Sequence, residues 1–182
     1  MSTIITNSVL APGSEKVMLR KSGCIMQSKQ YEYSSVYEDL QNNNLINMPG
    51  DLGNGNATIT PYFGDSKILF TAMIHCGHQT TWRTNFFRTF YRVTNSGSWT
   101  QFYGGFGNCL YSNTNAMSQT IKCSYLLDPS YSAGDLIGFK LQHIGHANGG
   151  HLHLNQISLT NTTANNNVIN AHSKIYLQEV AT

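Results

Sequence analysis

Short runs rich in β-branched and aromatic residues recur along the chain, separated by clusters of Asn, Gly, Ser, Thr and Pro. Runs such as KILFTAMIH (67–75) and HLHLNQISLT (151–160) have the length and composition of strands, and the clusters between them are turn formers. Helical periodicity is almost absent, and SSVYEDLQNNN (34–44) is the only, weak, candidate for a turn of helix. About ten such strands predict an all-β fold, an antiparallel β-sandwich in a single domain.

The charge of the chain is low for its length. Only 11% of its 182 residues are Asp, Glu, Lys or Arg, and the net charge is +2 without a basic run. Nucleic-acid binders depend on concentrated positive charge, so we expect no nucleic-acid partner. No apolar run approaches the roughly 20 residues of a membrane span, and the N-terminus has no charged segment followed by an apolar one. We therefore expect neither membrane insertion nor an export signal.

The cysteines do not have the spacing of a zinc knuckle, because no C-x-x-C pair occurs among Cys24, Cys76, Cys109 and Cys123. Cys109 and Cys123 could meet across a hairpin, and the sequence does not decide whether they are bridged. We expect mostly buried free thiols, because small buried cysteines are common. A chain without an export signal also folds in a reducing compartment.

The run NFFRTFYRVT (85–94) is apolar on both faces. The strand period of two puts Phe87, Thr89, Tyr91 and Val93 on one face, and the other face alternates aromatic and basic residues: Phe86, Arg88, Phe90 and Arg92. Aromatic residues among arginines indicate a second buried surface, so we predict a subunit interface there, with its arginines paired or at the rim. The alternative is a sheet edge covered by a loop. KILFTAMIH is two-sided in the same way, which also favours an oligomer.

Four segments, taken in order, resemble jelly-roll domains of marine bacteriophage virion proteins. They are ATITPYFGDSKILFTAMIHCG (57–77), NFFRTFYRVTNSGS (85–98), a long segment over 124–156 and SKIYLQEVA (173–181). The long segment contains an LDP turn, a strand, a glycine hairpin and an Asn-bearing strand, and the last segment ends in a Glu followed by a small apolar pair. The likeness extends from about Val17 to Ala181, so it covers nearly the whole chain.

This family is similar in fold to the tumour-necrosis-factor and complement globular-head group, whose jelly rolls form tight trimers. The resemblance implies an antiparallel jelly roll of about ten strands and a homotrimer, with residues 17–182 as the head domain and 1–16 as an N-terminal attachment arm. It also implies a phage virion structural protein, made in the host cytoplasm. Such a protein would be a tail-fibre tip, receptor-binding head or capsid decoration that contacts other virion proteins and attaches to the host surface.

Two other classes of function remain open on the sequence. A secreted carbohydrate-binding module would carry an export signal or be a monomer, and a polysaccharide-degrading enzyme would need paired catalytic carboxylates. The nine carboxylates are scattered, and no G-x-S-x-G elbow, P-loop or H-E-x-x-H motif is present. YGGFGN (103–108) has no helix after it, so we interpret it as a bulge or turn rather than a phosphate loop. We expect no catalytic activity.

Histidines gather in two places. In IHCGHQ (74–79), His75 and Cys76 point to opposite faces of a strand, so they chelate one ion poorly. In HIGHANGGHLHLN (143–155), the strand period places His151 and His153 on one face. Three such pairs around a trimer axis would supply six nitrogens to one transition metal, such as Fe, Ni or Co. The alternative is a polar hairpin whose histidines face solvent, a neighbouring strand or an interface; no other cofactor is expected.

A host glycan or receptor is the remaining expected partner. Amide-rich loops such as 42–56 could hydrogen-bond a glycan, and four aromatic residues could stack on sugar rings: Trp82, Trp99, Tyr103 and Tyr111. Aromatic side chains in a β-sandwich also serve in the core or in interfaces, and the sequence does not choose between these roles.

Overall fold

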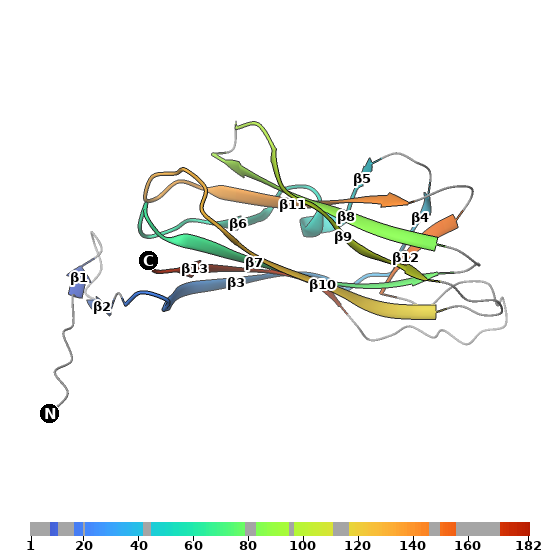
Figure 1. Cartoon of the computed structure of the whole chain (residues 1–182), viewed down its shortest axis with the longest axis horizontal. Coiled ribbons are helices and arrows are strands. Elements are labelled where there is room, and N and C mark those ends of the chain that lie inside the picture. The colour runs from blue at the N-terminus through green and yellow to red at the C-terminus, as the bar shows by residue number, and fades with distance from the viewer. Residues whose placement is uncertain are drawn as a thin grey trace, which may run out of the picture.

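The chain folds into two antiparallel β-sheets stacked as layers, as the sequence predicted (Figure 1). The computed structural model describes residues 8–10, 17–19, 21–41, 45–78, 83–94, 97–110, 117–145, 150–155 and 172–182. Within these ranges one short helical turn, η1 (Gly50–Leu52), accompanies the strands. No helix in the described part of the chain is long and apolar enough to cross a membrane.

The first layer, called the β7 sheet, is centred on the long strand β7 (Lys67–His78). β13 (Ser173–Val180) and β12 (Gly150–Leu154) pair with successive parts of one side of β7, and β10 (Met117–Leu127) pairs with its other side. β3 (Ile25–Tyr33) pairs with β13, and β4 (Tyr37–Gln41) pairs with β12.

The second layer, called the β8 sheet, is centred on β8 (Arg83–Val93) and β11 (Ile137–Gly145). β5 (Leu45–Asn47) and β6 (Ala57–Ile59) pair with successive parts of β11, and β9 (Thr100–Leu110) pairs with β8. The described residues thus place eleven strands in the two sheets, against about ten expected. The architecture is a jelly roll in which β5 with β6, and β12 with β13, each take the place of one longer strand.

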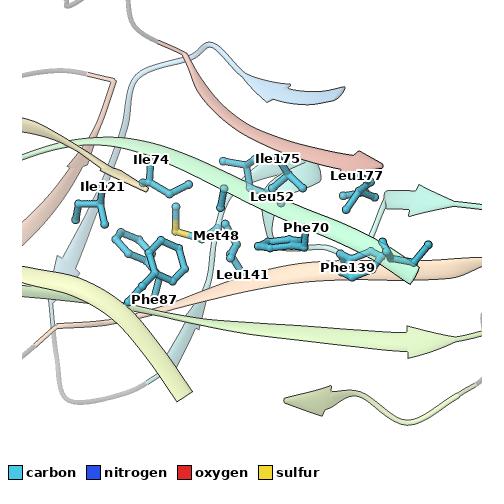
Figure 2. Packing of buried hydrophobic residues seen from close by; sticks show 14 of the residues in the cluster. Met48, Leu52, Phe70, Ile74, Phe87, Ile121, Phe139, Leu141, Ile175 and Leu177 are labelled. Atoms are coloured by element: carbon cyan, nitrogen blue, oxygen red, sulfur yellow. The ribbon is translucent and has the colours of Figure 1, made fainter. Parts of the chain in front are cut away.

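Every second side chain of the central strands points inward, and these side chains fill the space between the layers. Phe70 of β7 stacks on Phe139 of β11 with ring centroids 5.6 Å apart, and Phe102 of β9 meets Phe70 edge-on at 5.2 Å. Figure 2 shows Phe87 and Leu141 of the β8 sheet in the same buried cluster. Burying one such side chain contributes about 2 kcal/mol, so apolar packing, rather than charge, holds the two sheets together.

One segment differs from its prediction. SSVYEDLQNNN, the weak helix candidate, contains strand β4, whose five residues pair with β12 in antiparallel register. β12 offers a row of backbone donors and acceptors at this point, and pairing with them outweighs a weak local preference. The expectation of a helical turn was therefore wrong.

A two-stranded sheet lies near the N-terminus. β1 (Ser8–Leu10) pairs with β2 (Val17–Leu19), and Figure 1 draws this hairpin beside the sandwich. The pairing joins the predicted arm (1–16) to the first residues of the predicted head (17–182), and the strands of the sandwich begin at Ile25. The division into arm and head stays a prediction.

Asn155 connects the end of β12 to the start of β13. Its backbone N–H donates to the carbonyl of His75 at 2.9 Å, and its Oδ1 accepts from the N–H (3.0 Å) and the Oγ (2.9 Å) of Ser173. Its Nδ2 donates to the carbonyls of Tyr33 (2.7 Å) and Ser35 (3.0 Å). The residue is buried and has a φ of 56°, a left-handed conformation that Asn tolerates. These bonds, called the Asn155 joint, tie β3, β12 and β13 to β7.

Glu179, near the end of β13, is a fully buried carboxylate. It accepts hydrogen bonds from the N–H groups of Tyr62 (3.0 Å) and Phe63 (3.1 Å), and from Nε2 of Gln27 (2.7 Å). The Gln27 amide also donates to the carbonyl of Thr60 at 2.7 Å. The Glu of the closing segment therefore fixes the loop between β6 and β7.

We expect Asn155→Asp to lower the free energy of unfolding by about 3 kcal/mol, because it removes two donors and turns a negative charge toward the buried carbonyls of Tyr33 and Ser35. Urea denaturation followed by circular dichroism measures this change. Asn47→Asp is the matched control, since Asn47 is exposed and, among the described residues, its Oδ1 accepts from Gln142 (2.8 Å). Equal stability of the two variants would contradict the structural role of the Asn155 joint.

Candidate functional site

The histidine-rich hairpin is buried where the structure describes its side chains. His143 lies on β11 with its ring 5.2 Å from that of Phe87, inside the sandwich. His153 lies on β12, opposite Gly77 of β7, and is fully buried. His146 and the side chain of His151 lie outside the described residues. Two histidines that the sequence placed among polar hairpin residues thus have interior positions.

Burial of His153 bears directly on the predicted metal site at His151 and His153. Both residues belong to strand β12, but the fully buried ring of His153 has no surface through which to meet its equivalents in other subunits. Among the described residues, no group of three or more His, Cys, Asp or Glu side chains is arranged to hold a metal ion. An ion on the trimer axis stays a prediction, and the burial of His153 disfavours it.

In the IHCGHQ segment, neighbouring side chains point to opposite faces of β7, as predicted. Cys76 points into the core, and His75 points to the opposite face of β7, where its Nδ1 lies 2.6 Å from Oγ1 of Thr120. Burial, followed by the positive charges of Lys122, Lys174 and His172, lowers the pKa of His75 below its ordinary value of 6.5. The side chain of His78 lies outside the described residues.

The cysteines that the structure describes are free thiols: Cys24, Cys76 and Cys123. Cys123 lies on β10 beside Ala72, and burial raises its pKa from 9.0 to about 11. The side chain of Cys109 lies outside the described residues.

Two of the described carboxylates stabilise local structure. Glu179 fixes the β6–β7 loop, as described above. Glu32 accepts from Nζ of Lys174 at 3.2 Å and contacts Nδ1 of His172. The hydrogen bond from Lys174, above all, lowers the pKa of Glu32 below its ordinary value of 4.5, although burial acts in the opposite direction. Whether the chain is catalytic stays a matter of expectation.

The outer face of the β8 sheet carries the predicted interface residues. Phe87 and Thr89 are buried against the core, so their neighbours Phe86, Arg88, Phe90 and Arg92 lie on the opposite, outer face, as the alternation predicted. Phe86 is the most exposed of the four, at 41% of its surface. Their role in a subunit interface stays a prediction.

Two cations of this face lie over one aromatic ring. The guanidinium carbon of Arg92 is 4.6 Å, and Nζ of Lys140 is 4.7 Å, from the ring centroid of Trp99. Lys140 also lies 5.4 Å from the ring centroid of Phe90, its register partner across β11 and β8. We call these four residues the Trp99 cluster. Their packing explains an aromatic residue between the arginines without a partner subunit.

Two glycines leave the space that the side chains of the Trp99 cluster occupy. Gly55 has a φ of 86°, and a Cβ there would lie 2.7 Å from Cη2 and Cζ2 of Trp99. Gly138 is the register partner of Arg92, and a Cβ there would lie 3.2 Å from the carbonyl oxygen of Gly55 and 3.5 Å from Nε of Arg92. The indole and guanidinium groups therefore occupy space that other residues at these positions would fill.

The cluster joins residues from three separate segments, which is why the sequence did not reveal it. Arg92 was predicted as an interface residue and Trp99 as a sugar-stacking residue, but neither Lys140 nor Gly55 was singled out. Burial and the nearby charge of Arg92 lower the pKa of Lys140 below its ordinary value of 10.5. The described residues provide Arg88, Arg92 and Lys140 with no carboxylate within ion-pair distance.

The other predicted sugar-stacking residues are differently placed. Tyr103 packs on Tyr125 with ring centroids 5.8 Å apart, where β9 faces β10. Trp82 and Tyr111 lie outside the described residues. YGGFGN belongs to β9, and the pairing with β8 shifts register next to Tyr103, which confirms the interpretation as a bulge.

The sandwich exposes apolar residues along β9 and β10, the outermost described strands of their sheets. Tyr103 is 39% exposed, Tyr125 is 41% exposed and Leu126 is 50% exposed. Phe102 packs on Tyr125 at 5.8 Å and so connects this surface to the core. We call these three exposed residues the β9–β10 edge.

Comparison with known proteins gives resemblances at low sequence identity. No protein-family model matches the chain, and no curated protein matches it by sequence. It is similar to the Eiger TNF of S. frugiperda, with 9% identity and a TM-score of 0.47 over 85% of this chain and 92% of that one. It is also similar to a chain of the Gx strain of infectious bursal disease virus, with 11% identity and a TM-score of 0.37 over 100% of this chain and 46% of that one. A chain of the Gt strain of that virus matches with 9% identity and a TM-score of 0.41 over 98% of this chain and 42% of that one. The chain spans less than half the length of the two virus chains, and its assignment as a jelly roll rests on the two sheets described above.

We expect the stability of the protein to fall as the pH drops from about 7.5 to 5.5, in part because of His75. Its pKa is lowered in the folded state, so the unfolded chain binds more protons below about pH 6.5 and the folded state loses stability there. His75→Gln keeps a group that can hydrogen-bond Thr120 but does not titrate. Denaturation across this range should therefore give a shallower pH dependence for the variant, and identical slopes would contradict the assignment.

Proposed function

We propose that the chain is a structural protein of a bacteriophage particle, a homotrimeric jelly-roll head that attaches the particle to its host. It would serve as a tail-fibre tip or receptor-binding head, or as a decoration of the capsid. The observation that carries the proposal is the jelly roll itself, built from segments whose order resembles phage virion jelly rolls. The low charge and amide-rich loops suit an exposed surface on a particle.

Attachment through such a head would be multivalent. Each subunit contributes one weak contact to the host surface, and linking several copies on one particle raises the effective concentration of the remaining contacts. A head therefore needs a stable scaffold and repeated copies, whereas a deep pocket in each subunit is unnecessary. The closely packed core, centred on Phe70 and Phe139, meets the first of these requirements.

Two surfaces are candidates for the trimer contact. The first is the predicted group on β8, where Phe86 is exposed while Phe90 is covered by Lys140. The second is the β9–β10 edge, where the exposed rings of Tyr103 and Tyr125 lie together and Leu126 is exposed on the other face of β10. Sheet edges that expose apolar residues are prone to pairing and are usually covered. The β9–β10 edge is therefore the favoured contact.

Native mass spectrometry should show a particle of three times the chain mass of 20.2 kDa. Leu126→Glu places a charge in the favoured contact, so we expect it to shift the population toward monomer at micromolar concentration. Phe86→Glu is the matched variant on the β8 face and should leave the trimer intact. The opposite pattern would assign the contact to β8, and a monomeric wild-type protein would overturn the trimer.

The place of the protein in the particle is tested separately. Purified particles of the phage whose genome encodes the chain should contain it, as detected by mass spectrometry of their proteins. An antibody against the recombinant head should label either the fibre tips or the capsid in electron micrographs. Its absence from intact particles would overturn the virion assignment.

A further inference from the structure

We propose that the Trp99 cluster binds the carboxylate or sulfate groups of an anionic polysaccharide on the host surface. The inference deepens the attachment function proposed above, on which it rests, by naming the class of polymer that is bound. Four observations support it. Two cations lie over one ring, neither has a described carboxylate partner, two glycines make room for the indole and guanidinium groups, and two amides share the same face.

The first observation is the proximity of two positive charges. Arg92 and Lys140 each lie within 5 Å of the Trp99 ring centroid, and the two like charges repel one another, since Arg92 contributes to the lowered pKa of Lys140. The face of an indole ring attracts each cation but does not neutralise it. An anion that reaches both cations would offset the repulsion and would gain a charge-assisted hydrogen bond from each.

The second observation concerns the charges around the pair. Arg88, four residues before Arg92 on β8, adds a third cation to the same face. Asp51, the carboxylate nearest in sequence to Gly55, accepts from Nδ2 of Asn56 at 3.3 Å and forms no described ion pair with Arg92. Positive charge without a described internal counterion makes this face complementary to a negative partner.

The third observation is that the cations are held in place. A side chain at Gly55 would collide with Trp99, and one at Gly138 would crowd Arg92, so the two glycines allow the indole and guanidinium groups to lie close against the sheet. Side chains fixed in this way lose less conformational entropy on binding than freely moving surface lysines. The cluster therefore resembles a prepared anion site more than a solvated face.

The fourth observation favours a sugar polymer over other anions. Gln101 is the register partner of Phe90 and Gln142 is that of Arg88, so both amides share the outer face with the cations. Amides can hydrogen-bond the hydroxyl groups of a sugar, while the cations pair with its acid groups. The chain has a net charge of only +2 and no basic run, which argues against the dense phosphates of a nucleic acid.

The test compares three polymers with one backbone: neutral dextran, carboxymethyl-dextran and dextran sulfate of equal length. Biolayer interferometry with the full-length protein at about 0.15 M salt measures the binding of each. We expect binding to one or both charged polymers and none to neutral dextran, and the preferred polymer identifies the acid group. Equal binding to neutral dextran, or no binding to either charged polymer, would overturn the proposal.

Paired substitutions identify the residues. The double variant Arg92→Gln/Lys140→Gln should weaken binding at least about tenfold, because both charge-assisted contacts are lost. Lys21→Gln/Lys29→Gln removes the same charge from two exposed positions at and near β3 and should bind as the wild type does. Lys140→Arg, which keeps the charge, should retain most of the binding, and circular dichroism of the double variant shows whether it is folded.

Two further outcomes separate this inference from the proposals it rests on. A wild-type monomer, or a protein absent from particles, that still binds charged dextran through Arg92 and Lys140 would overturn the head function and leave the site standing. A double variant that dissociates the trimer while each chain binds the polymer as before would show that the cluster contacts a second subunit, and the polysaccharide site would be wrong.

Discussion

The jelly roll depends on the Asn155 joint, because there the strand that should run along β7 changes from β12 to β13. A sheet interrupted at its centre would leave backbone donors and acceptors buried without partners, at a cost of about 1–3 kcal/mol each. The side-chain amide of Asn155 replaces the missing backbone groups, since its oxygen faces Ser173 and its nitrogen faces the chain between β3 and β4. The alignment of β12 and β13 on β7, and hence the shared core face, follows from this one residue.

On the outer surface of the β8 sheet, aromatic side chains are covered without a hydrophobic partner. Aromatic rings on a solvent face are usually buried by another subunit, but here cations of the same chain cover Phe90 and Trp99. The arrangement covers the rings, and no described residue accepts a hydrogen bond from the cations. Apolar cover is needed instead at the β9–β10 edge, so the two surfaces suit different kinds of partner.

The sequence was sufficient for features that depend on the period of a strand. Alternation predicted the buried and outer faces of β8 and the opposite directions of His75 and Cys76. It failed where long-range contacts decide: the partner strand β12 makes β4 a strand, and packing on Phe87 places His143 inside the sandwich. The Trp99 cluster brings together positions 90, 92, 99 and 140, with Gly55 against the indole ring, and no local pattern encodes their proximity.

The pKa of about 11 at Cys123 has a consequence for the reactivity of the sulfur inside the sandwich. Thiols react with oxidants and disulfides chiefly as thiolates, and at neutral pH this group is almost entirely protonated. Cys76 is withdrawn from solvent altogether. The sandwich thus keeps Cys76 and Cys123 poorly reactive toward oxidants, the first by burial and the second by its raised pKa.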